Sequence, residues 1–144
     1  MSAWNWRSAD IPVVNVSWND AVAYTEWLSK QTGQTWQLPS EEEWEYAARA
    51  PGQPGSHEAA FWWGPELPKE QAGQPLRANC DGCDPVYQRR IAPVGSYVAN
   101  PFRLHDTAGN VWEWTSSVYT DDNKLADTKK VTEYSGRREK RCLS

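Results

Sequence analysis

Two cysteines separated by two residues are the first candidates for chemistry in this chain. Cys80 and Cys83 form a C-x-x-C pair, and the third cysteine, Cys142, lies near the C-terminal end. Such a pair can form a local disulfide, hold a metal or exchange thiols. A zinc site needs four ligands. The two histidines of the chain, His57 and His105, are the possible additions to the cysteine pair. The surrounding residues are typical of turns, so we favour plain thiols or a local disulfide over a metal site or a redox pair.

Two carboxylates near residue 110 are the second candidate. Asp106 and Glu113 stand seven residues apart, across a turn that contains Gly109. Calcium takes six to eight oxygens and mixes carboxylates with backbone carbonyls. A turn can bring both carboxylates to one point, with the carbonyls of Gly109 and Val111 directed inward. The alternative is that Asp106 caps the Gly109–Asn110 turn and Glu113 pairs with an arginine.

Other patterns give weaker signals. Trp62 and Trp63 are adjacent and could stack on a ligand, although such a pair in a Trp-rich chain is usually part of a core. The three glutamates at 41–43 suit the first turn of a helix better than a metal cluster. The sequence contains no Ser/His/Asp arrangement, phosphate loop or nucleic-acid motif, and we assign no catalytic residue.

The composition predicts one folded domain. The 144 residues include ten Trp, six Tyr and two Phe, which exceeds what disordered chains carry. Residues 1–123 carry a net charge of −8 and residues 124–144 a net charge of +4. The acidic body argues against nucleic-acid binding, and we interpret the basic segment as a solvated end or a contact for an acidic partner. With no long apolar run and no visible signal peptide, we expect no membrane partner and a cytoplasmic protein, bacterial in origin, or an excised domain.

Local patterns predict two helices and several short strands. Ser17 with Asp20 and Ser40 with Glu43 are typical of helix starts, and they predict helices over 18–31 and 40–50. The segment 51–90, which is rich in Pro and Gly, is predicted to be irregular. Residues that favour extended chain predict strands over 11–16, 92–97 and 111–115.

Four segments in this order resemble one family. They are Pro12–Trp18 with Asp20–Ala21, Leu38–Arg49, Ala92–Tyr97 and Asp106–Trp114. Together they are similar to the formylglycine-generating enzyme, or sulfatase-modifying-factor, domain over about residues 11–118. The resemblance implies an α+β, C-type-lectin-like fold with two N-terminal helices, short antiparallel strands and much irregular loop. It also implies bound calcium and, in the oxidases of the family, conversion of a substrate protein cysteine to formylglycine with copper and O2.

The resemblance also implies particular metal ligands. Asp106, Gly109, Val111 and Glu113 match one calcium site of the oxidases. A second site would use Asn79 and the carbonyl of Cys80, with a later carboxylate whose position falls near Val86. We therefore expect this second site to be incomplete.

The sequence departs from the family where copper would bind. The oxidases hold copper with two cysteines near their C-terminal end, whereas here only Cys142 lies downstream, in a sequence that does not match. Cys80 and Cys83 lie in the long loop and cannot be transferred to that role, and a single thiolate is a poor copper site. Arg103 and His105 also replace Gly and Tyr. If residue 103 needs a positive φ, Arg costs about 1 kcal/mol there.

These observations lead to three hypotheses about function. We favour a calcium-stabilised, non-catalytic binding or remnant module that takes a protein or peptide ligand, with residues 1–120 as a partial domain and 121–144 as a non-native or disordered basic tail. The alternative is a formylglycine-generating oxidase completed by missing sequence or a second chain. The third is a truncated product whose open sheet edges pair in a homodimer.

Overall fold

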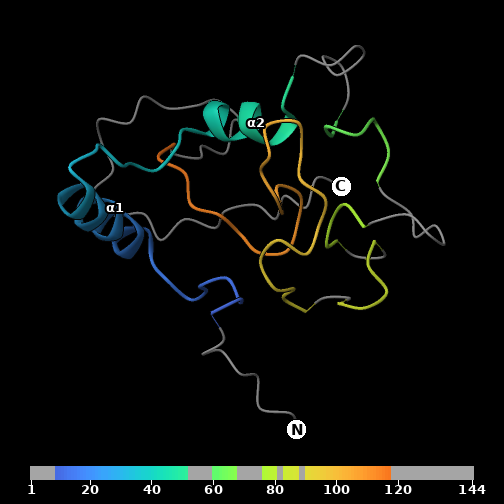
Figure 1. The fold of residues 1–144 in the computed structure, drawn as a ribbon, viewed down its shortest axis with the longest axis horizontal. Coiled ribbons are helices and arrows are strands. Elements are labelled where there is room, and N and C mark those ends of the chain that lie inside the picture. The colour runs from blue at the N-terminus through green and yellow to red at the C-terminus, as the bar shows by residue number, and fades with distance from the viewer. Residues whose placement is uncertain (1–8, 52–59, 68–75, 81–82, 88–89, 118–144) are drawn as a thin grey trace, which may run out of the picture. The chain divides into compact units, whose positions relative to one another are not determined.

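The computed structural model describes residues 9–51, 60–67, 76–80, 83–87 and 90–117. These residues belong to two compact units. The first unit holds residues 9–14 and the described part of 46–112, and the second holds 15–45 and 113–117. The helices of these residues are α1, Trp18–Thr32, and α2, Glu41–Arg49, and the rest is loop (Figure 1). Neither helix is long and apolar enough to cross a membrane.

Helix α1 begins and ends as the sequence predicts. The Ser17 hydroxyl accepts a hydrogen bond from the Asp20 amide at 3.1 Å, and the Asp20 carboxylate accepts one from the Ser17 amide at 2.8 Å. The hydrogen bonds from Ser17 lower the pKa of Asp20. Gly33 ends the helix in the left-handed region with φ 70°, and its amide donates to the Ser29 carbonyl. The predicted helix is confirmed and is one residue longer.

Helix α2 starts with the same kind of reciprocal cap. The Glu43 amide donates to the Ser40 hydroxyl at 3.1 Å, and the Ser40 amide donates to the Glu43 carboxylate at 2.8 Å. At the other end, the side-chain amide of Asn100 donates to the carbonyls of Ala47 and Ala48. Carbonyls in the last turn of a helix have no partner within it, so a residue 53 positions away in sequence satisfies the end of α2.

The three predicted strands over 11–16, 92–97 and 111–115 are wrong. The described residues contain two isolated bridges, Phe61 with Gly64 and Asn79 with Gly109. They contain no strand of two or more residues. Extended segments become strands only when their backbone groups pair with a neighbouring strand. Here side chains take that place.

Indole groups bind the backbone of two of these segments within the second unit. The Trp114 Nε1 group donates to the Val16 carbonyl and the Trp18 Nε1 group donates to the Thr115 carbonyl, each at 3.0 Å. In the first unit, the Asn110 side chain accepts from the Ala92 amide at 2.8 Å and donates to the Ala92 carbonyl at 3.2 Å. Backbone groups occupied in this way are not available to a strand ladder.

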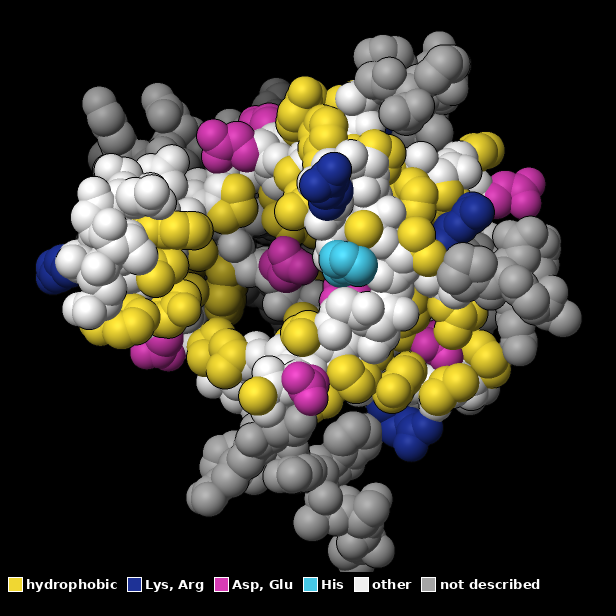
Figure 2. All heavy atoms as spheres, in the orientation of Figure 1, with side chains coloured by type: hydrophobic (Ala, Val, Ile, Leu, Met, Phe, Trp, Pro, Cys, Tyr) yellow, Lys and Arg dark blue, Asp and Glu magenta, His cyan; other side chains and the backbone are white. Residues whose placement is uncertain are grey.

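The buried residues of the described chain all lie in the first unit. They are mostly small or polar, with two aromatic side chains among them: Ala48, Ala50, Phe61, Ala78, Asn79, Cys80, Cys83, Asp84, Ala92, Tyr97 and Asn100. In the second unit no described residue is buried. Helix α1 carries Tyr24 and Trp27 more than half exposed, and Figure 2 shows hydrophobic side chains gathered where Figure 1 places α1.

One glycine permits a close approach of two backbone segments in the first unit. Gly109 has φ 85°, and a Cβ built on it would lie 2.1 Å from the Asn79 carbonyl oxygen. The Asn110 amide donates to that same oxygen at 3.0 Å. Any larger residue would therefore push residues 79 and 109 apart and break this bond.

The Gly109→Ala variant tests that contact. Gly95→Ala is the matched control, because Gly95 has φ 74° but nothing within 4 Å of its added Cβ. We expect the control to lose about 1 kcal/mol of unfolding free energy from φ alone, and Gly109→Ala to lose about 1–3 kcal/mol more from the clash. Urea unfolding followed by tryptophan fluorescence measures both, and equal losses would contradict the contact.

Candidate functional site

The turn before Asp106 is fixed by one asparagine. The side-chain oxygen of Asn100 accepts hydrogen bonds from the amides of Phe102 and Leu104, at 2.9 and 3.0 Å. Within the turn, Arg103 has φ 65° and Asp106 has φ 57°. Arg103 therefore occupies the left-handed backbone that the sequence pattern suggested, a position that favours glycine.

Asp106 is held against the segment 95–97 of its own unit. Its carboxylate accepts from the Gly95 amide at 2.6 Å and from the Tyr97 amide at 3.3 Å. Among the described residues, the Asp106 carboxylate thus binds the segment 95–97. It does not cap the Gly109–Asn110 turn, which was the alternative to a calcium site. Both carboxylate oxygens are in use, although each keeps a further lone pair for a cation.

The other residues of the expected calcium site fall in both units. Gly109 and Val111 belong to the first unit with Asp106, and the Gly109 carbonyl accepts from the Val111 amide at 3.0 Å. Glu113 belongs to the second unit, where its carboxylate accepts from the Trp44 indole at 2.7 Å. The four-residue site stays a prediction. The described residues hold no group of three or more His, Cys, Asp or Glu side chains that could bind a metal.

Asn79 and Cys80, the expected ligands of a second calcium site, are occupied by protein contacts. The Asn79 side-chain amide donates to the Arg90 carbonyl at 2.8 Å and to the Asn110 side-chain oxygen at 3.1 Å. The Cys80 carbonyl accepts from the Cys83 amide at 3.0 Å. Both residues are buried, whereas Val86, where a carboxylate was expected, is exposed and apolar.

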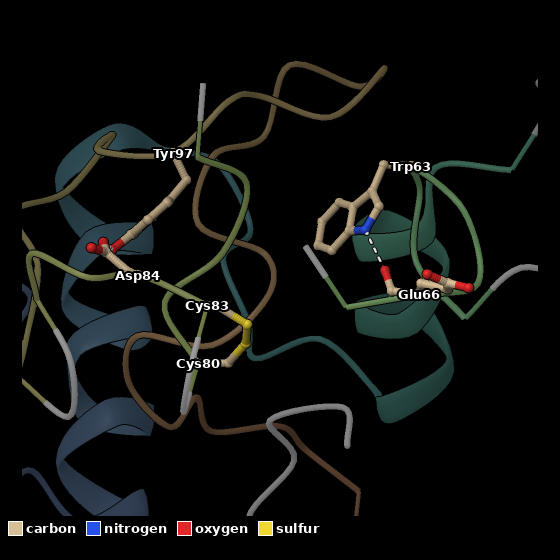
Figure 3. Close-up of a disulfide and its surroundings, with 6 residues drawn as sticks. All are labelled: Trp63, Glu66, Cys80, Cys83, Asp84 and Tyr97. Atoms are coloured by element: carbon tan, nitrogen blue, oxygen red, sulfur yellow. Dashed lines mark hydrogen bonds between the residues drawn. A yellow bond between two sulfur atoms is a disulfide. The ribbon is translucent and has the colours of Figure 1, made fainter. Parts of the chain in front are cut away.

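A buried carboxylate lies two residues earlier, and the sequence analysis missed it. The Asp84 carboxylate accepts from the amides of Val86 and Tyr87, at 2.6 and 3.1 Å, and from the Tyr97 hydroxyl at 2.6 Å. Figure 3 shows the side chains of Asp84 and Tyr97 pointing toward each other. The Asp-Pro pair at 84–85 predicts the local turn bonds, but nothing local points to Tyr97.

This pair perturbs the phenol. The pKa of Tyr97 lies well above its ordinary value of 10.0, because the hydroxyl is buried and because it donates to Asp84, whose charge opposes ionisation. Asp106 adds to this effect. Tyr97 therefore keeps its proton in the folded protein, and its hydroxyl acts as a hydrogen-bond donor rather than as a base.

Cys80 and Cys83 are joined in a disulfide, which agrees with the local disulfide that the sequence analysis favoured and leaves a redox role open. Cys142 and His57 lie outside the described residues. His105 is exposed, and its Nδ1 atom lies 2.7 Å from the Tyr97 carbonyl oxygen.

Trp62 and Trp63 belong to an aromatic cluster of the first unit. The Phe61 and Trp63 rings are stacked with centroids 4.7 Å apart, and Trp62 meets Trp63 edge-on at 5.2 Å. The Arg77 guanidinium lies 5.9 Å from the centre of the Trp62 ring, and the Trp63 indole donates to the Glu66 carbonyl. These contacts favour a packing role, and the ligand-binding role of this pair stays a prediction.

Comparison with known proteins identifies the family. Residues 4–141 match the sulfatase-modifying factor enzyme 1-like domain. The chain belongs to this family. The match extends beyond the residues 11–118 over which the motifs themselves carry the resemblance.

Named relatives and a solved structure agree with this membership. The formylglycine-generating enzyme of Streptomyces coelicolor is 42% identical over 122 residues, which cover 76% of this chain and 33% of the relative. The inactive C-alpha-formylglycine-generating enzyme 2 of Bos taurus is 39% identical over 118 residues, covering 76% and 34%. The structure of PvdO from Pseudomonas aeruginosa is similar with a TM-score of 0.60 and 36% identity, covering 78% of this chain and 40% of PvdO. The chain thus has the fold type of this family and spans about a third of the length of these curated relatives.

The raised pKa of Tyr97 predicts a loss of stability in alkaline buffer. The unfolded chain releases the phenolic proton near pH 10, whereas the folded chain retains it, so this contribution is complete below pH 10 and declines as the pH rises further. In calcium-free buffer, we expect the unfolding free energy of the native protein to fall more steeply above pH 10 than that of Tyr97→Phe. Parallel pH profiles of the two proteins in urea unfolding would contradict the assignment.

Proposed function

We propose that this chain is a non-catalytic, calcium-stabilised binding module of the formylglycine-generating enzyme family. The observation that carries the proposal is the state of its cysteines. Two of the three are joined to each other and buried, with 7% of Cys80 and 2% of Cys83 exposed. A linear, two-coordinate copper(I) site of the family's kind takes two soft ligands such as thiolates, and Cys142 by itself supplies one.

The similar proteins include some that are named as enzymes and one that is named as inactive. One of the similar curated proteins is named as an inactive enzyme, and its identity to this chain is close to that of the relatives named as enzymes. The scaffold is therefore compatible with loss of the oxidase activity. Formylglycine generation, completed by further sequence or a second chain, is the alternative that the experiment below tests.

The surface of the second unit supports a polypeptide ligand. Tyr24 and Trp27 are stacked with ring centroids 5.6 Å apart, and they are 59% and 52% exposed. Trp36 is 45% exposed, and its indole donates to the Thr32 hydroxyl at the end of α1. Exposed aromatic side chains are enriched where proteins contact other proteins. A protein or peptide chain is the ligand that this surface suits.

Calcium is the metal that the donor set suits. The ligands proposed by resemblance are the carboxylates of Asp106 and Glu113 and the carbonyls of Gly109 and Val111, all of which are hard oxygen ligands. Since the Asp106 carboxylate also holds the amides of Gly95 and Tyr97, a cation on its free lone pairs would be linked to the stability of that segment. Calcium would therefore act on folding rather than on a reaction.

A copper(I) titration tests the non-catalytic role. Under anaerobic conditions and in competition with a chromophoric copper(I) chelator, we expect the chain to retain no stoichiometric copper. In air with a cysteine-containing peptide, we expect no oxygen uptake above that of a Cys142→Ser control. Retention of one copper per chain together with peptide-dependent oxygen uptake would establish the oxidase instead.

Calcium removal tests the structural metal. We expect the thermal midpoint of unfolding to be higher in calcium than in a chelator. A ligand at 100 times its Kd adds about 2.7 kcal/mol to the free energy of unfolding. Asp106→Asn and Glu113→Gln should abolish this response, whereas Glu42→Gln, an exposed carboxylate of α2, should retain it. Equal midpoints in calcium and in chelator would exclude a calcium site in this chain.

A further inference from the structure

The Cys80–Cys83 disulfide closes a very short ring in the first unit. The two residues are three positions apart, with Cα atoms 5.0 Å from each other, and the Cys83 amide donates to the Cys80 carbonyl. A cross-link restricts the unfolded chain less when the ring is short. Its main effect is therefore local: it fixes the distance between the residues on either side.

Those flanking residues are two of the residues whose polar groups connect segments of the unit. Asn79 precedes Cys80, and it binds Asn110 through its carbonyl and both Arg90 and Asn110 through its side chain. Asp84 follows Cys83, and its buried carboxylate accepts hydrogen bonds from the amides of Val86 and Tyr87. It also accepts one from the hydroxyl of Tyr97, which is 13 residues away in sequence. Figure 3 shows the Asp84–Tyr97 pair beside the disulfide, with the sulfur atoms directed away from it.

We propose that Cys80 and Cys83 form a reversible thiol–disulfide exchange site that takes a dithiol as its reductant and controls the contacts of Asn79 and Asp84. The oxidised pair holds Asn79 and Asp84 at a fixed spacing. The reduced pair releases that spacing, and the contacts to Asn110 and Tyr97 loosen while the second unit is unaffected. The exchange step itself involves neither a peptide ligand nor calcium.

The exchange proceeds in two balanced steps. A thiolate of the dithiol attacks the sulfur of Cys80, which is the more exposed of the two, and Cys83 leaves as a thiolate that takes up a proton. The second thiol of the reductant then loses its proton and attacks the mixed disulfide, and Cys80 leaves and is protonated. Two electrons and two protons pass to the protein, and the dithiol becomes a disulfide.

A redox titration of the folded chain tests this proposal. The Cys142→Ser variant, which retains the pair, is equilibrated with mixtures of reduced and oxidised dithiothreitol, quenched, alkylated and mapped by peptide mass spectrometry. We expect Cys80 and Cys83 to be alkylated together in one two-electron transition that oxidised dithiothreitol reverses. Reduction that occurs only in urea would identify a static cross-link, and thiols that remain reduced in oxidised buffer would exclude the disulfide; either result overturns the proposal.

Hydrogen exchange shows whether these contacts respond. On reduction we expect the amides of Ala92, Tyr97 and Asn110 to exchange at least about tenfold faster. The Gly33 amide, which donates to Ser29 at the end of α1, serves as the internal control and should not change. The double variant Cys80→Ser with Cys83→Ser should show the fast pattern in both buffers. Unchanged exchange at all three amides, or equal acceleration at Gly33, would refute local control.

Discussion

The described part of the structure depends on how buried backbone groups find hydrogen-bond partners where no sheet supplies them. Buried amides and carbonyls need hydrogen-bond partners whether or not a strand lies beside them. In the first unit the partners are side chains of Asn79, Asn100 and Asn110, and each binds more than one group. An asparagine amide carries a donor and an acceptor on one rigid plane, so a single residue can hold two loops. Replacing such a residue removes several bonds at once and leaves buried groups unpaired.

The same constraint governs two carboxylates of the first unit, one of which, Asp106, is an expected calcium ligand. Asp84 and Asp106 each accept backbone amides, and Asp84 also accepts the Tyr97 hydroxyl. These two carboxylates thus hold loop segments in place through hydrogen bonds. A cation bound at Asp106 would share oxygens with this framework, and its binding would then be linked to the free energy of folding.

The cysteines connect the fold to the function that we propose. Sulfur joined in a disulfide cannot serve as a thiolate ligand, so the chemistry open to the pair is exchange with another thiol. Family membership fixes the scaffold, whereas activity depends on the groups placed on it. The relatives named as enzymes are about three times as long as the part that this chain matches, so their activity does not transfer with the scaffold alone.

The sequence by itself determined the features that depend on neighbouring residues. Both helices and their caps follow from Ser17 with Asp20 and Ser40 with Glu43, since these bonds span three positions, and ordered motifs gave the family. Tertiary structure decided the rest. The expected strands failed because a ladder requires a partner strand, and side chains such as Trp114, 98 positions from Val16, bind those backbone groups instead. The Asp84–Tyr97 pair and the helix end bound by Asn100 were likewise invisible, because no local pattern records which distant groups meet when the chain folds.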